Sequence, residues 1–223
     1  MIDGFRMVLD NTDVLMIGRL LDPHSIAVYF AAIRTGGLVA FVSFSMMALA
    51  VPKFAEIHST GTPQDLQKFV SEVIQLMFWP SLLTAGVLAA VGPYVLSLFG
   101  ADFASGYPTM LVILAGLVLR SAIGPVEYLL NVTGHHRDTM RVYALAAAAN
   151  VALSLLLIPA LGIIGAAIAT YVAMLCGNAC LWVLVRKRLG VNAFVFPFKS
   201  SARHQGHESE TEPSLTQPRE AVS

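Results

Sequence analysis

The sequence is poor in charged residues and carries no excess of either sign. Only 13% of its 223 residues are Asp, Glu, Lys or Arg, against about 25% in an ordinary soluble domain, while 56% are hydrophobic. Lysine plus arginine equal aspartate plus glutamate at 14 each, so no surface for nucleic acid is indicated. These values exclude an ordinary soluble domain and indicate a membrane protein.

Cysteines and catalytic motifs are equally scarce. The two cysteines, Cys176 and Cys180, are four residues apart in an apolar run, which favours two small buried apolar side chains over a disulfide or a metal site. No HExxH, Walker, GxSxG or CxxC pattern occurs. We therefore expect no enzyme and no cofactor. The first residues carry acids where a signal peptide needs positive charge, so we expect no cleaved targeting segment.

Long apolar runs are what the sequence has in abundance. Five of them are long enough to cross a hydrocarbon layer of about 30 Å at about 1.5 Å per residue. They are Ser25–Val51, Val73–Phe99, Tyr107–Leu130, Val142–Ile158 and Ile163–Val185. The sequence therefore predicts an all-α, polytopic membrane protein.

A sixth crossing is predicted over Met1–Leu20, although this segment is less apolar. Its charges follow an i, i+3, i+7, i+10 pattern, which confines them to one face of a helix lining a protein interior or a wet cavity. They are Asp3, Arg6, Asp10 and Asp13. The alternative is a helix lying flat on the bilayer. We expect a six-helix unit over residues 1–198 and a disordered cytoplasmic tail over residues 199–223.

Basic and neutral loops alternate along the chain. The loops after the first, third and fifth apolar runs are basic, and the loops around residues 99–106 and 159–162 contain no Lys or Arg. The basic positions are Lys53, Lys68, Arg137, Arg141, Arg186, Lys187 and Arg188. Because basic loops stay in the cytoplasm, we expect both ends there. Residues 52–68 are predicted as a surface amphipathic stretch, broken at Gly61 and Pro63.

Three charged residues lie inside the apolar runs, where ionisable groups usually face a partner or a cavity. Arg120 is predicted about 18 Å deep, at a cost of about 2.5–3.5 kcal/mol on insertion scales, which its apolar neighbours offset. Glu127 lies two turns further along the same predicted helix, about 10 Å away and too far for a direct pair. Arg120 therefore needs another partner, and a cavity-lining role is favoured.

Arg34 is predicted about 14 Å deep in its own helix. Asp13, on the preceding antiparallel helix, should lie at a comparable depth, so a structural ion pair between the two is one hypothesis. The other hypothesis is a cavity in which Arg34 and Arg120 bind an anionic head group, because the guanidinium fork suits phosphate.

The order of several stretches resembles the carboxyl-terminal half of the polysaccharide-exporting flippases. This family transports O-antigen and exopolysaccharide precursors, and it is grouped with the lipid II flippases and the multidrug and toxin extrusion antiporters. The resemblance covers roughly Asp10 to Gly190. It rests on DNTDVLMIG, VYFAAIR, VPKFAE, LFGADFASGYPTMLVILAG, the Gly134 turn, ANVALSLLLIPALGIIGAAIAT and RKRLG, in this order.

The resemblance implies one lobe of a two-lobe exporter in the bacterial inner membrane, working by alternating access. It implies an isoprenoid-pyrophosphate-linked oligosaccharide as substrate, with Arg34 and Arg120 as cavity arginines for the pyrophosphate. Such transporters have twelve or more helices, so a missing N-terminal six-helix lobe or a second subunit is an expected partner. The bilayer is the other expected partner.

Two alternatives stay open. The chain could be half of a cation-coupled drug antiporter, in which Asp10, Asp13 and Glu127 bind protons or cations. It could also be a non-transporting membrane subunit or a degenerate fragment, which would agree with the missing lobe.

Overall fold

The computed structural model describes residues 13–14, 16–190 and 193–195. Residues 13–14 and 16–20 are helical. The elements that follow are α2 (Pro23–Thr60), α3 (Pro63–Ser97), the 3-10 helix η1 (Ala101–Gly106), α4 (Tyr107–Ile123), α5 (Val126–Val132), α6 (His136–Leu161) and α7 (Ile163–Leu189). Asp3, Arg6, Asp10 and the predicted tail lie outside the described residues.

Every described element is a helix, which confirms the all-α class. Within the described residues, five helices are long and apolar enough to cross a membrane. These spans are Pro23–Ile57, Gln64–Ser97, Ala101–Ile123, His136–Leu161 and Ile163–Arg188. They correspond to the five apolar runs. The length and composition of these helices therefore indicate a membrane-embedded helical protein.

The boundary between α2 and α3 is set by capping residues. Asp22 caps α2 by accepting hydrogen bonds from the backbone amide of Ser25 at 3.1 Å and from its hydroxyl at 2.8 Å. Thr62 and Asp65 form a reciprocal capping box at the start of α3. The break between the helices therefore falls at Gly61–Thr62, as predicted. Residues 52–68 form the predicted surface amphipathic stretch, because most of their described side chains are exposed whereas Phe54 and Leu66 are buried. The stretch is not an element of its own, since α2 continues through Pro52 to Thr60 and α3 begins at Pro63.

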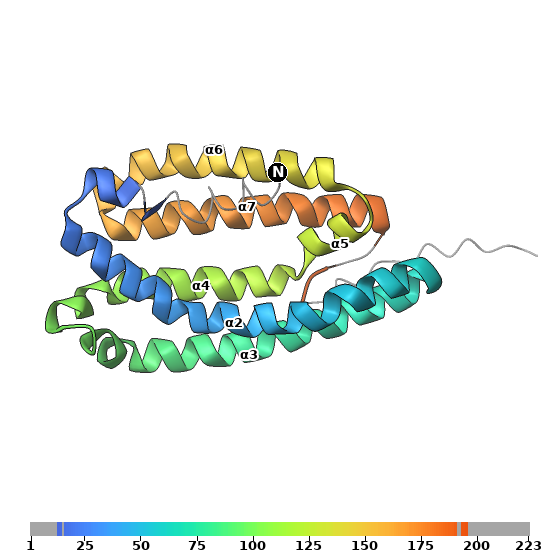
Figure 1. The fold of residues 1–223 in the computed structure, drawn as a ribbon, viewed down its shortest axis with the longest axis horizontal. Helices are drawn as coiled ribbons and strands as arrows, with labels where there is room; N and C mark the ends of the chain where they lie inside the picture. The colour runs from blue at the N-terminus through green and yellow to red at the C-terminus, as the bar shows by residue number, and fades with distance from the viewer. Residues whose placement is uncertain (1–12, 15, 191–192, 196–223) are drawn as a thin grey trace, which may run out of the picture.

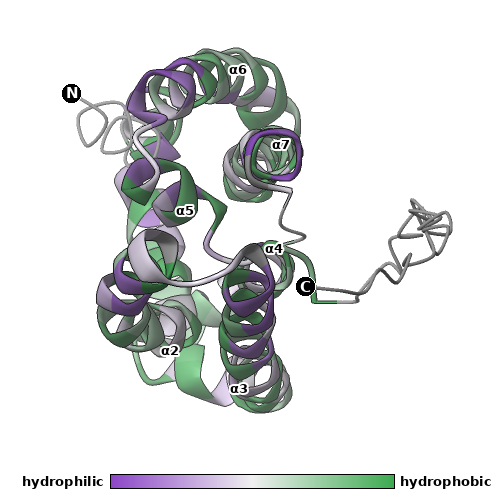
Figure 2. Ribbon diagram, turned by 90° about the vertical axis from the view of Figure 1, so that its right-hand side faces the viewer, coloured by the Kyte–Doolittle hydropathy of each residue, from purple (hydrophilic) through white to green (hydrophobic). Residues whose placement is uncertain are grey.

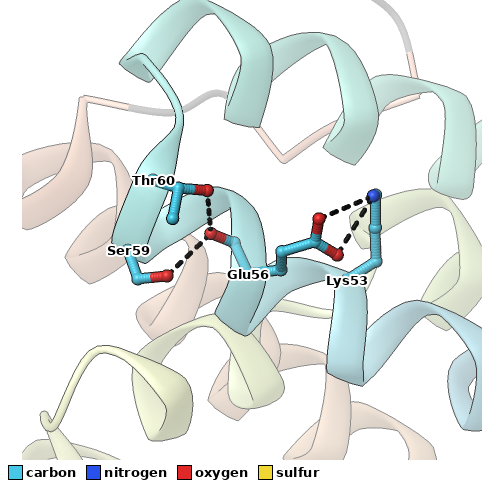
Figure 3. Close-up of polar contacts among 4 residues, drawn as sticks. All are labelled: Lys53, Glu56, Ser59 and Thr60. Carbon is cyan, nitrogen blue, oxygen red and sulfur yellow. Dashed lines mark hydrogen bonds and ion pairs between the residues drawn. The ribbon is translucent and has the colours of Figure 1, made fainter.

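The end of α2 is polar and exposed (Figure 3). The Lys53 ammonium donates to both carboxylate oxygens of Glu56, at 3.1 and 3.0 Å. The hydroxyls of Ser59 and Thr60 donate to the Glu56 carbonyl, each at 2.9 Å. These side-chain contacts all converge on Glu56, and such exposed polar groups suit a helix end in water.

The helices are arranged as two antiparallel pairs with α4 between them (Figures 1 and 2). The α2–α3 pair lies on one side and the α6–α7 pair on the other, and α4 packs against α2, α3 and α7. Helices α2 and α3, with 38 and 35 residues, project beyond the shorter helices at one end. The basic loops at the ends of α2, α5 and α7 gather at this same end, as their alternation along the chain requires.

Two apolar clusters hold the bundle together. One lies toward the projecting end and includes Phe54, Ile74, Leu130 and Leu181, all fully buried. The other lies toward the opposite end and includes Tyr29, Leu96, Met110, Ile113 and Ile158. Helix α7 lies close against α6 at Gly165, because a Cβ on Gly165 would lie 2.3 Å from the Leu157 carbonyl oxygen.

The expectation that the two cysteines are buried is wrong. Cys176 and Cys180 are free and exposed on α7, whereas Ala173 and Gly177 of the same helix are buried. In a membrane-spanning helix an apolar side chain can face lipid without loss, so hydrophobicity alone does not tell the buried face from the outer one.

Candidate functional site: a cavity at a broken helix

The predicted helix over Tyr107–Leu130 is in fact two helices. Helix α4 ends at Ile123 and α5 begins at Val126, with Gly124 and Pro125 between them. Gly124 has φ of 73° and ψ of −169°, a backbone conformation that is essentially restricted to glycine. A Cβ at this position would also lie 2.5 Å from Cγ1 of Ile74 on α3. Glycine is therefore required for the turn and for the approach of α3.

The break removes helical hydrogen bonds at membrane depth, where no bulk water replaces them. Two backbone contacts compensate in part: Val126 N–H donates to the Gly124 carbonyl at 3.0 Å, and Val195 N–H donates to the Ala122 carbonyl at 3.0 Å. Non-helical backbone is tolerated in membrane proteins where it is buried in protein or lines a water-filled cavity. Here it does both.

A cavity of about 170 Å³ lies against the break. Helices α2, α3, α4, α5 and α7 all contribute to its wall, so it lies inside the bundle between the two pairs. Its apolar lining includes Phe44, Met47 and Met77. Its polar lining consists of Ser43, Arg120, Ser121, Glu127, Tyr128 and Asn178. The cavity has room for several water molecules or for one compact polar group.

Arg120 enters the cavity from the last turn of α4 and is half-buried. Its Nη1 atom lies 3.8 Å from the thioether sulfur of Met174 on α7, which is a weak acceptor. Within the described part of the chain Arg120 forms no ion pair. The C-terminal end of a helix carries partial negative charge, which stabilises a cation there. The position in the last turn of α4 therefore favours the positive charge, and the weak contact with Met174 leaves most of the guanidinium donors available.

Glu127 enters the same cavity from the first turn of α5 and is only 7% exposed. Its carboxylate accepts a hydrogen bond of 2.7 Å from the Tyr143 hydroxyl on α6. The sequence placed Glu127 and Arg120 along one straight helix axis. The break instead turns the chain so that both side chains line one cavity, although the two charges do not form an ion pair.

Arg34 is not part of this cavity. It is exposed on α2, where its guanidinium carbon lies 5.8 Å from the ring centroid of Phe30. The hypothesis of an ion pair with Asp13 is wrong, because Asp13 is buried and accepts a hydrogen bond from the Tyr29 hydroxyl instead. Tyr29 and Arg34 are five residues apart, about 140° around the helix, and so point to different sides of α2.

Asp13 belongs to a second polar cluster, away from the cavity. Tyr29 lies next to Thr170 of α7, and the Thr170 hydroxyl is 3.4 Å from the side-chain oxygen of Asn150. The Ser154 hydroxyl donates to the same Asn150 oxygen at 3.3 Å. Asn150 and Ser154 are fully buried on α6. The cluster thus joins the helix of residues 13–20 to α2, α6 and α7.

Sequence reasoning had found Arg120, Glu127 and Asp13 as isolated charges but missed their neighbours. Asn150, Thr170 and Asn178 are uncharged polar residues in apolar runs, and each was a signal that could have been used. The chain matches no protein-family model and no curated protein.

Proposed function

We propose that the chain is half of a membrane flippase for polysaccharide biosynthesis. In this proposal it moves an isoprenoid-pyrophosphate-linked oligosaccharide across the bacterial inner membrane by alternating access, with both of its ends in the cytoplasm. The observation that carries the proposal is Arg120, a half-buried arginine in a cavity at a broken helix, with no acidic partner among the described residues.

The energetics of Arg120 favour an anionic ligand. An arginine at the centre of a membrane helix costs about 2.5–3.5 kcal/mol on insertion scales. A helix C-terminus returns about 0.3–1 kcal/mol, and up to about 2 kcal/mol in a partly buried geometry. The rest of the insertion cost is offset by water in the cavity or by an anion that enters the cavity. A phosphate oxygen pair would engage the guanidinium in bidentate fashion.

Arg34 supports a partner on the outer face of α2. It lies eleven residues after Pro23, about 17 Å along the helix, and is exposed at this depth. Large apolar side chains share its face at helical spacing, namely Phe30, Leu38, Phe41 and Leu49, and all are exposed. A charged group at this depth is unfavourable in lipid, so the face suits a second lobe or subunit that lines a wet path with it.

The test is a pair of substitutions at Arg120, assayed in cells that also supply the partner lobe. Arg120→Ala should abolish export of the lipid-linked oligosaccharide while membrane abundance stays close to wild type. Arg120→Lys should restore part of the activity, because an ammonium keeps the charge but loses the bidentate geometry. Arg19→Ala, at an exposed position outside the cavity, is the matched control and should export normally.

Two results would contradict the proposal. Full export by Arg120→Ala at normal abundance would show that the guanidinium does not bind substrate. Loss of the protein from the membrane would assign Arg120 a structural role instead.

The orientation has its own test. Reporter fusions after Ser59, Gly106, His136 and Leu161 should read inside, outside, inside and outside in turn. The prediction follows from the basic loops at the projecting end of the bundle. A periplasmic signal at His136 would reverse it.

A second candidate, a cation-coupled antiporter, is favoured by the buried cluster around Asp13. A carboxylate that is 2% exposed among hydroxyl and amide groups of four helices is a suitable site for a proton or a monovalent cation. If this function is correct, Asp13→Asn should abolish cation-dependent efflux of a cationic drug, and Arg120→Ala should leave efflux intact. The reverse pattern favours the flippase.

A further inference from the structure

The chain turns back on itself after α7. Helix α7 ends at Leu189, and Gly190 follows in the left-handed conformation, with φ of 67° and ψ of 5°. The next described residues, 193–195, lie beside the end of α4 (Figure 1, orange-red trace). The segment that leaves the last helix therefore returns to the helix break in the middle of the bundle.

Contacts from residues 193, 194 and 195 all hold this segment in place. The Val195 amide donates to the Ala122 carbonyl, which is one of the carbonyls that the end of α4 leaves open. Ala193 is fully buried in the apolar cluster that also contains Val126 and Leu129 of α5. The Phe194 ring lies 6.2 Å from the Trp182 ring on α7, between centroids. One short segment thus contacts α4, α7 and the cluster in which α5 packs.

The segment does not line the cavity. The cavity wall includes Ser121, Gly124 and Pro125, whereas Val195 meets the adjacent carbonyl of Ala122. The cavity and the segment therefore adjoin the same turn of backbone, through different residues.

We propose that residues 193–195 are a latch on the hinge between α4 and α5. With the latch in place, the Ala122 carbonyl is paired and α5 is held against α7, which fixes the angle of the hinge and keeps Ser121 buried in the cavity wall. When the latch is released, the hinge at Gly124–Pro125 is free to change its angle, which widens the cavity and admits water and solutes to this buried part of its wall. The latch itself is inferred from the contacts alone. Its role, which is to regulate access of a ligand to Arg120, rests on the proposed function.

A latch of this kind is releasable because it is small. Its contacts include one backbone hydrogen bond, the buried Ala193, the Val195 side chain against the apolar cluster and the ring contact of Phe194, whereas α5 itself is held by the buried side chains of Val126, Leu129 and Leu130. Releasing three residues therefore leaves the helices packed. The expected result is a local opening rather than unfolding.

The experiment measures access of water to the cavity, and it requires no substrate. In the full chain with Cys176→Ala and Cys180→Ala, Ser121→Cys is a reporter that is 2% exposed and lines the cavity. A charged, water-soluble thiol reagent is applied to membranes, and the labelling rate is measured. Val195→Pro removes the amide donor of the latch, and Val195→Ala keeps it.

Val195→Pro should raise the labelling rate of Ser121→Cys at least tenfold, and Val195→Ala should change it less than twofold. A second reporter, Ser154→Cys in the other buried cluster, should stay unlabelled in both variants. Equal rates for Val195→Pro and the parent would overturn the latch. A parallel rise at Ser154→Cys would also overturn it, because the segment would then be a general structural support.

If Val195→Pro does not accumulate in the membrane, Phe194→Ala takes its place. This change removes the ring contact with Trp182 and should raise labelling at Ser121→Cys, while Phe99→Ala, exposed at the opposite end of the bundle, should not. Equal labelling in these two variants would refute the latch. Labelling is independent of export, so failure of the latch and failure of the flippase proposal are separate results.

Discussion

Replacement of Gly124 by alanine is the most direct test of the broken helix. The added Cβ would lie 2.5 Å from Cγ1 and 2.7 Å from Cδ1 of Ile74, well inside van der Waals contact. Overpacking of this kind costs about 1–3 kcal/mol. The backbone conformation of Gly124 adds about 1–3 kcal/mol for a residue with a side chain. Gly124→Ala should therefore lower the free energy of unfolding by about 2–6 kcal/mol.

The assay is thermal unfolding of the purified chain in detergent. At about 2–4 °C per kcal/mol for a chain of this size, the unfolding midpoint should fall by on the order of 10 °C. Gly37→Ala is the matched control, because Gly37 lies inside α2 and a Cβ there would meet nothing within 4 Å. In a helix interior alanine is favoured over glycine by about 1 kcal/mol, so this control should be neutral or slightly stabilised.

A double variant separates the two causes. Gly124→Ala combined with Ile74→Ala removes the overlap and leaves the backbone strain, so the double variant should lose less than the sum of the two single changes. If Gly124→Ala unfolds at the wild-type temperature, the break does not exist in this form. The predicted continuous helix would then be the better description.

Two further predictions concern polar contacts, one at the cavity and one at the start of α2. Tyr143→Phe removes a hydrogen-bond donor from the buried Glu127 carboxylate and should lower the free energy of unfolding by about 1–3 kcal/mol in the same assay. The control Tyr128→Phe should leave it unchanged, and equal unfolding midpoints for the two variants would contradict the contact. Hydrogen bonds from Ser25 hold the pKa of Asp22 below its usual value of 3.8, so the stability that Asp22 gives to the start of α2 is present above that value. This stability should be lost as the pH falls through the lowered pKa of Asp22. The loss is measured as faster amide hydrogen exchange in the first turn of α2, after correction for the intrinsic exchange rates. The control Asp22→Asn, which keeps a hydrogen-bond acceptor, should show no such loss.

The spans and most helix boundaries were predictable because local chemistry sets them. Apolar runs of sufficient length have few alternatives in a membrane, and five of them became the five spans. The start of α3 is indicated by Thr62, Pro63 and Asp65, which form a capping pattern that depends only on neighbouring residues. The end of α2 follows from Gly61 in the same way.

The helix break was not predicted, although the sequence contained a signal for it. Apolar residues predominate on both sides of Gly124 and Pro125 within residues 107–130, so length and composition favour one helix. Gly124 followed by Pro125 is a turn signal, because the residue before proline is biased away from the helical conformation. What the dipeptide alone does not give is the position of Ile74, which closes the space where a side chain at Gly124 would lie. That contact depends on how α3 packs.

The placement of the arginines depends on packing in the same way. Depth along a helix follows from residue number, and this part of the reasoning needs only the helical rise. The direction in which a side chain points depends on where the helix meets its neighbours. Arg34 and Tyr29 lie on one helix, yet Tyr29 is buried against Asp13 while Arg34 is exposed. The pattern of charges in the sequence carried no information on which of the two would meet the acid.

The break also explains how one span carries both an arginine and a glutamate that do not pair. In an unbroken helix both side chains would need partners from other helices at membrane depth, since a helix interior offers no free backbone groups. The break places Arg120 in the last turn of α4, where the helix dipole favours a cation, and Glu127 at the start of α5, within reach of the Tyr143 hydroxyl. Each charge is thus stabilised separately, and the donors of Arg120 are left facing the cavity rather than being neutralised by Glu127. A guanidinium held in this way can bind an anion and release it again, which a buried ion pair would prevent.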